Sequence, residues 1–77
     1  MSREEIKEKL LSEKNARLIL VFNYKDRQYA KTIKVDNDEI NTVYFEIEED
    51  MVREVLDEKT LLYFKDKYEI EKNNKIF

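Results

Sequence analysis

The sequence contains no cysteine, histidine, glycine, proline or tryptophan. The first two absences exclude disulfides, thiolate and imidazole metal ligands, a cysteine nucleophile and an imidazole general base. Without glycine there is no glycine-rich phosphate loop, and glycine-dependent tight hairpins are disfavoured. Catalysis would need paired carboxylates, a lysine or a tyrosine in a pocket, which a chain this short seldom encloses. We therefore expect no enzymatic activity, no cofactor and no metal.

Long hydrophobic runs are also missing. The longest apolar run is Leu18 to Phe22, far below the roughly 20 residues of a membrane-spanning helix. No apolar stretch of secretory length occurs near the start. These features predict a cytoplasmic protein that does not contact a membrane.

The residues that are present suffice for one small ordered domain, residues 1–77. Hydrophobic residues make up 42% of the 77, which is too apolar for a disordered tail even though 43% are charged. We expect residues 73–77 to form a frayed tail, or to cover an apolar edge through Ile76 and Phe77.

The first half reads as a helix followed by strands. Ser2 and Glu5 form a capping box, so a helix should begin at Arg3 and end near Asn15, which tolerates a left-handed cap. Residues 16–24 then alternate as a central strand that is apolar on both faces. One face would hold Leu18, Leu20, Phe22 and Tyr24, and the other Ile19 and Val21.

Two more strands are expected at residues 29–35 and 42–47, each after a polar turn. Asp50 can then cap a helix with the apolar residues Met51, Val52, Val55 and Leu56, and strand patterns follow at residues 60–64 and 68–71. The prediction is an α+β fold, an antiparallel sheet of three to five strands with two helices, in the order α-β-β-β-α-β. Both helices should share one sheet face. The alternative is one long helix over residues 51–72.

Charge is concentrated in the middle of the chain, where residues 35–58 contain ten acidic residues and one basic residue. A surface of this kind could bind a basic protein partner, such as a nucleic-acid-binding protein whose phosphate-binding groove is lined by Lys and Arg. The alternative is that these carboxylates lie on solvated outer faces, and that Glu48, Glu49 and Asp50 complement a helix N-terminus. The candidate partner-binding residues are Asp36, Asp38, Glu39, Glu46, Glu48, Glu49, Asp50, Glu54, Asp57 and Glu58.

An N-terminal amphipathic helix followed by residues 33–56, IKVDNDEINTVYFEIEEDMVREVL, resembles the small acidic phage-encoded Cas9 inhibitors, which are anti-CRISPR proteins. The resemblance lies in element order, acidity and an Asn/Asp turn, and it covers roughly the first two thirds of the chain. The basic residues 59–77 depart from that pattern. The resemblance implies a non-enzymatic inhibitor of a nucleic-acid-handling enzyme, from a phage or mobile element.

Two other functions stay open. The chain could be a small nucleic-acid-binding module, in which basic and aromatic residues of the first hairpin contact phosphates and bases. These residues are Lys25, Arg27, Lys31 and Lys34 with Tyr24 and Tyr29. It could also be a structural or designed domain without a cellular target.

Surplus apolar residues on the predicted strands indicate self-association. If both helices cover one sheet face, a homodimer or a partner protein should cover the other. The residues predicted for this contact are Ile19, Val21, Tyr44 and Tyr63.

Overall fold

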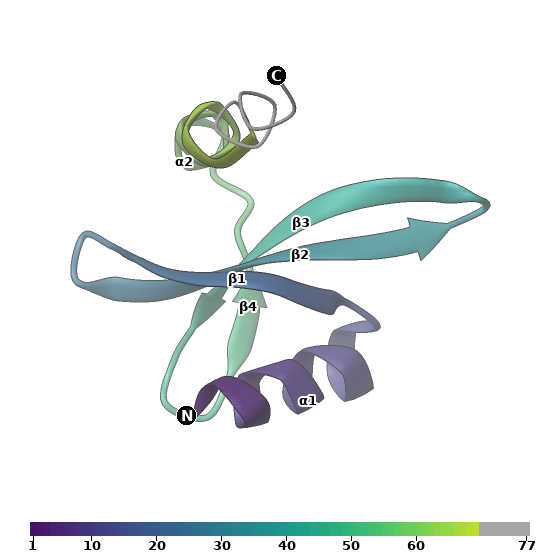
Figure 1. Cartoon of the computed structure of the whole chain (residues 1–77). Coiled ribbons are helices and arrows are strands. Elements are labelled where there is room, and N and C mark those ends of the chain that lie inside the picture. Colours follow the sequence, from purple (N-terminus) through teal and green to yellow (C-terminus); the bar gives the residue numbers. More distant parts are fainter. Residues whose placement is uncertain (70–77) are drawn as a thin grey trace, which may run out of the picture.

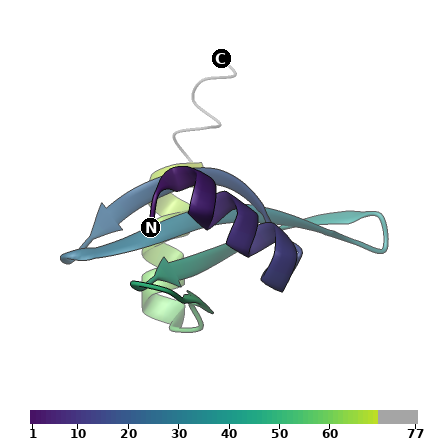
Figure 2. The same ribbon diagram turned by 90° about the horizontal axis from the view of Figure 1, so that it is seen from below.

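The computed structural model of the protein describes residues 1–69, which form a four-stranded antiparallel sheet with one helix on each face (Figure 1). The strands lie side by side in chain order, β1-β2-β3-β4. Seen from below, α1 crosses the near face of the sheet and α2 lies behind it (Figure 2). The elements are α1 (Arg3–Lys14), β1 (Arg17–Tyr24), β2 (Arg27–Asp36), β3 (Glu39–Ile47), β4 (Val52–Glu54), α2 (Glu58–Phe64) and the π-helical turn η1 (Lys65–Glu69).

The ends of α1 are set by the caps that the sequence predicts. The Glu5 backbone N–H donates to Ser2 Oγ at 3.2 Å, and the Ser2 N–H donates to Glu5 Oε1 at 3.1 Å. Hydrogen bonding of the Glu5 carboxylate by the Ser2 backbone N–H, and then by the Ser2 side chain, lowers the pKa of Glu5. Asn15 ends the helix with φ of 52°, in the left-handed region. The predicted bounds of the first helix are therefore confirmed.

Both long hairpins turn through only two residues, although the chain has no glycine. Lys25 and Asp26 have φ of 49° and 62°, and Asn37 and Asp38 have φ of 49° and 66°. Positive φ at both central residues is the requirement of a type I′ turn, which matches the twist of the flanking strands. The expectation that such tight hairpins are disfavoured is wrong here, because Asn and Asp tolerate this conformation and strand pairing holds Lys25 in it.

A β-bulge in β1 changes which side chains share a face. The pairing of β1 with β2 shifts register between Leu18 and Leu20. As a result, Leu18 and Val21 both pack under α1, whereas Phe22 and Tyr24 pack under α2. The simple alternation predicted for residues 16–24 is therefore wrong at this point, because the bulge inserts one extra residue.

The two faces of the sheet carry separate cores. The core under α1 is mostly aliphatic and is formed by Ile6, Leu10, Ala16, Ala30, Phe45, Ile47 and Val52. The core under α2 is aromatic and centres on Tyr29, Tyr44 and Phe64, with Phe22, Tyr24 and Tyr68 against it. The prediction that both helices share one face is wrong, since α2 and η1 cover the second face.

The α+β class, the antiparallel sheet and the two helices are confirmed, but the order of the elements is α-β-β-β-β-α. Residues 52–54 form a strand instead of the predicted helix, and Val52 pairs with Ile47. This strand places Val52 in the core under α1, and the Val55 N–H donates to the Tyr44 carbonyl at 2.9 Å. Exposed Met51 and Leu56 lie outside both cores.

The second helix begins at Glu58, where the sequence pattern predicts a strand at 60–64. Asp57 Oδ2 caps it by accepting hydrogen bonds from the Thr60 N–H at 3.0 Å and from Thr60 Oγ1 at 2.7 Å. The strand and the single long helix predicted for this region are both wrong. The strand predicted at 68–71 is wrong at residues 68 and 69, which belong to η1. Its remaining residues lie outside the described part of the chain, as does the predicted tail 73–77.

Candidate functional site

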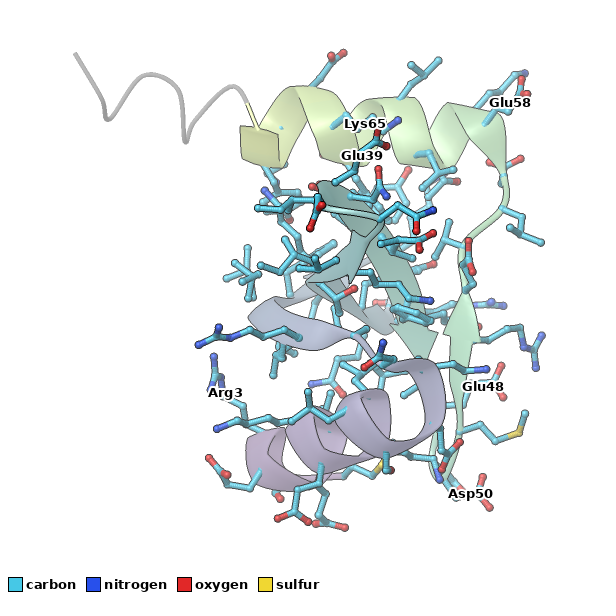
Figure 3. All side chains as sticks on the ribbon, turned by 90° about the vertical axis from the view of Figure 1, so that its right-hand side faces the viewer. Arg3, Glu39, Glu48, Asp50, Glu58 and Lys65 are labelled. Carbon is cyan, nitrogen blue, oxygen red and sulfur yellow. The ribbon has the colours of Figure 1, made fainter. Side chains whose placement is uncertain are left out.

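The ten predicted acidic residues form two separate groups. Asp36, Asp38 and Glu39 lie at the tip of the β2–β3 hairpin, which extends beyond both helices (Figure 1). The other seven lie on β3, β4, the loops that follow them and the start of α2. In Figure 3, Glu48, Asp50 and Glu58 mark this second group along the β4 side of the molecule.

Several carboxylates of the second group have partners within the fold. Glu46 Oε1 accepts from Arg27 Nη1 at 2.9 Å and from the Tyr29 hydroxyl at 3.4 Å, and Glu48 pairs with Arg53 at 3.0 Å. The hydrogen bond from Arg27 lowers the pKa of Glu46. Burial, followed by the charge of Glu46, raises the pKa of Tyr29. These residues are therefore partly neutralised.

Asp57 has a structural role as the cap of α2. Its hydrogen bonds from Thr60 lower its pKa, because they favour the charged carboxylate. Glu58 follows in the first turn of α2, where a negative charge complements the helix dipole. The sequence interpretation gave this helix N-terminal role to Glu48, Glu49 and Asp50, and it is wrong for those three because strand β4 follows them.

The exposed residues Glu49, Asp50 and Glu54 are different. Their side chains make no hydrogen bond or ion pair with any residue in the described part of the chain. Glu49 and Asp50 form the turn between β3 and β4, and Glu54 ends β4. These three carboxylates are the members of the second group that are available to a partner.

Glu49 also joins two adjoining hollows into what we call the acidic groove. The first hollow has a volume of about 490 Å³ and the second about 430 Å³, and they share Met1 and Glu49. Carboxylates from α1, the first hairpin turn, β3 and the β3–β4 turn meet along it. The acidic groove is defined by Met1, Glu5, Glu8, Asp26, Glu46, Glu48, Glu49 and Asp50.

Basic side chains in the acidic groove are already paired. Arg27 is bound to Glu46, and this pairing raises the pKa of Arg27. Lys9 pairs with Glu13 one turn further along α1, at 3.0 Å. The groove therefore presents a surplus of negative charge, above all from Glu8, Glu49 and Asp50.

Glu5, Glu8 and Asp26 belong to this groove but are not among the residues predicted from sequence. Glu5 and Glu8 are three residues apart, so they share one face of α1. That spacing is visible in the sequence. What the spacing cannot show is that this face lies beside the β3–β4 turn, because the packing of α1 on the sheet sets that contact.

The residues predicted for self-association are only partly exposed. Tyr44 is 1% exposed, its hydroxyl donates to the Phe64 carbonyl at 3.5 Å, and α2 covers it. Val21 packs against the core under α1. The assignment of these two to an open surface is wrong because the helices occupy opposite faces. Ile19 and Tyr63 are exposed, so their role in self-association stays a prediction.

The basic first hairpin does not present a free surface of lysines and tyrosines. Lys31 is 6% exposed and lies between Leu20 and Tyr44 on the neighbouring strands. Lys25 lies over the ring of Tyr24, which in turn packs on Tyr63 with ring centroids 5.0 Å apart. These aromatic rings are engaged in packing, which leaves fewer of them for stacking on bases.

Comparison with protein-family models, curated proteins and solved structures gives no match for this chain. Within residues 1–69, no three Asp or Glu side chains are grouped closely enough to hold a metal ion. The described helices are all too short or too polar to cross a membrane.

Proposed function

We propose that the protein is a non-enzymatic binding module that takes a basic segment of a partner protein in its acidic groove. The supporting observation is that carboxylates from four segments of the chain line one groove whose basic residues are already paired. Opposite charge steers such encounters and contributes more to association rate and specificity than to raw affinity.

The partner class follows from this charge. Proteins that bind nucleic acid place Lys and Arg where the phosphates lie, so a groove of carboxylates can compete for the same residues. In its sharpest form the proposal is that the chain inhibits a nucleic-acid-handling enzyme by occupying its phosphate-binding surface. The anti-CRISPR resemblance belongs to this form of the proposal.

A DNA displacement experiment tests the proposal. Labelled duplex DNA is bound to a set of bacterial nucleases, including a Cas9, and the native chain is titrated in while fluorescence anisotropy is followed. The groove variant carries Glu8→Gln, Glu49→Gln and Asp50→Asn. The tip variant carries Asp36→Asn, Asp38→Asn and Glu39→Gln, which removes the same charge from the far end of the β2–β3 hairpin.

The proposal predicts that the native chain and the tip variant displace DNA from at least one enzyme. The groove variant should do so at least roughly tenfold more weakly, and added salt should weaken the native chain as well. Equal loss in both variants would show that only net charge matters. Failure of the native chain against every enzyme would reject the inhibitor form of the proposal.

A further inference from the structure

The outer half of the β2–β3 hairpin has an apolar surface that no described element covers. Val35 and Ile40 are opposite each other across the two strands and are 64% and 70% exposed. The tip of this hairpin reaches past α1 and α2 in Figure 1. Two large aliphatic side chains side by side in water favour association with another surface.

A hollow beside this pair extends the apolar surface. It has a volume of about 210 Å³ and is lined by Leu11, Asn15, Arg17, Ile33 and Val35. The hollow lies at the start of β1, where Arg17 pairs with Ile33. Beyond this pair, residues 34–36 of β2 pair with β3 on one side and have no strand on the other. Val35 is thus both an exposed side chain and part of the wall of a hollow that could receive an apolar side chain.

The charges on the two sides of this surface are opposite in sign. Asp36 and Glu39 are directly opposite each other at the hairpin tip, an arrangement of like charges that destabilises a strand pair. Neither makes an ion pair with a described residue. On the other side, Lys14 ends α1 and exposed Arg17 begins β1, and they too lack a described ion-pair partner.

We propose that this surface, formed by Leu11, Ile33, Val35 and Ile40 with its flanking charges, binds a second copy of the same chain about a two-fold axis. A two-fold contact places the acidic tip of each copy against the basic side of the other. It would thereby relieve the repulsion between Asp36 and Glu39. A partner with charge of a single sign would leave one side unmatched. The surface is separate from the acidic groove, so the proposal does not depend on the proposed function.

Analytical ultracentrifugation of the full chain tests this, over concentrations from about 1 μM to about 1 mM, which span weak to moderate dimers. The native chain should show a dimer that forms with rising concentration. Ile40→Lys should weaken it by roughly tenfold or more, since the apolar pair is lost and a charge is introduced. Leu62→Lys is the matched control, because Leu62 on α2 is also highly exposed, at 62%, and should leave the dimer unchanged.

A charge exchange gives a second, independent test on folded variants. Glu39→Lys and Arg17→Glu should each weaken the dimer, and the double variant should restore it at least in part, because the exchanged charges again face each other across the two-fold axis. The proposal is overturned if the native chain is monomeric throughout the range or if Ile40→Lys dimerises like the native chain. It is also overturned if the double variant loses as much dimer affinity as the two single variants together. If the native chain is monomeric, another segment or another protein must cover this surface.

Discussion

The two faces of the sheet are stabilised in different ways. Under α1, a twelve-residue helix with a cap at each end packs aliphatic side chains such as Ile6 and Leu10 onto the sheet. Under α2, a seven-residue helix contributes one fully buried residue, Phe64, to a group of aromatic rings. The first helix therefore contributes two fully buried side chains to its face, whereas the second contributes one.

Phe64 is fully buried because six aromatic rings surround it. Its ring centroid lies between 5.0 and 6.3 Å from those of Phe22, Tyr24, Tyr29, Tyr44, Tyr63 and Tyr68. Distances in this range are typical of favourable aromatic pairs. A short helix gains little from its own hydrogen bonds, so α2 relies on this burial to stay on the sheet.

Replacing Phe64 by alanine should have the largest effect on stability. We expect a loss of about 4 kcal/mol in the free energy of unfolding, because a large buried ring leaves a cavity among aromatic neighbours. Urea unfolding followed by circular dichroism measures this, and the near-ultraviolet tyrosine signal should fall as well. Leu62→Ala, an exposed position on the same helix, should change stability little. A loss below about 1 kcal/mol for Phe64→Ala would contradict the central role of this ring.

Leu10→Ala tests the other face. We expect a loss of about 3 kcal/mol, since Leu10 is fully buried among aliphatic neighbours. In the absence of urea the near-ultraviolet tyrosine signal should be retained, because the buried tyrosines lie on the opposite face. Lys7→Ala, exposed on the same helix, is the control. Loss of the tyrosine signal in folded Leu10→Ala would show that the two cores are not separate.

The smallest expected effect concerns the pH dependence of stability that comes from the Glu46 carboxylate on β3. Its pKa is lowered by Arg27, so the ion pair stabilises the fold above the unfolded glutamate pKa, about 4.3. That contribution is lost as the pH falls through the lower pKa of the folded state. Glu46→Gln should therefore reduce stability at pH 7 and lose less further stability on acidification than the native chain. Parallel pH profiles for the two proteins would contradict this.

Local signals account for what the sequence could predict of the fold. The bounds of α1 follow from Ser2, Glu5 and Asn15, which act through bonds to their own neighbours. The secondary structure of residues 51–56 could not be predicted in the same way. The spacing of Val52 and Val55 fits a helical stripe, and only the open edge of β3 makes a strand the better solution. The bulge in β1 likewise depends on pairing with β2.

The candidate site was predictable to a similar extent. Glu49 and Asp50 stand out in the sequence as part of an acidic run, and the structure leaves both exposed in the β3–β4 turn. Glu8 and Asp26 come from distant segments, and only the packing of α1 and the first hairpin brings them to the same groove. Charge along the chain thus indicated one side of the groove, while tertiary contacts supply the other.

The most direct test of the account locates binding on the surface. The isotope-labelled chain is titrated with a short arginine-rich peptide, and the backbone amide shifts are followed by nuclear magnetic resonance. The account predicts that the largest shifts occur at Glu8, Glu49 and Asp50, that salt reduces them, and that the groove variant lacks them. Equal or larger shifts at the hairpin tip around Asp38, or no shifts at all, would contradict the claim that the acidic groove is the binding site.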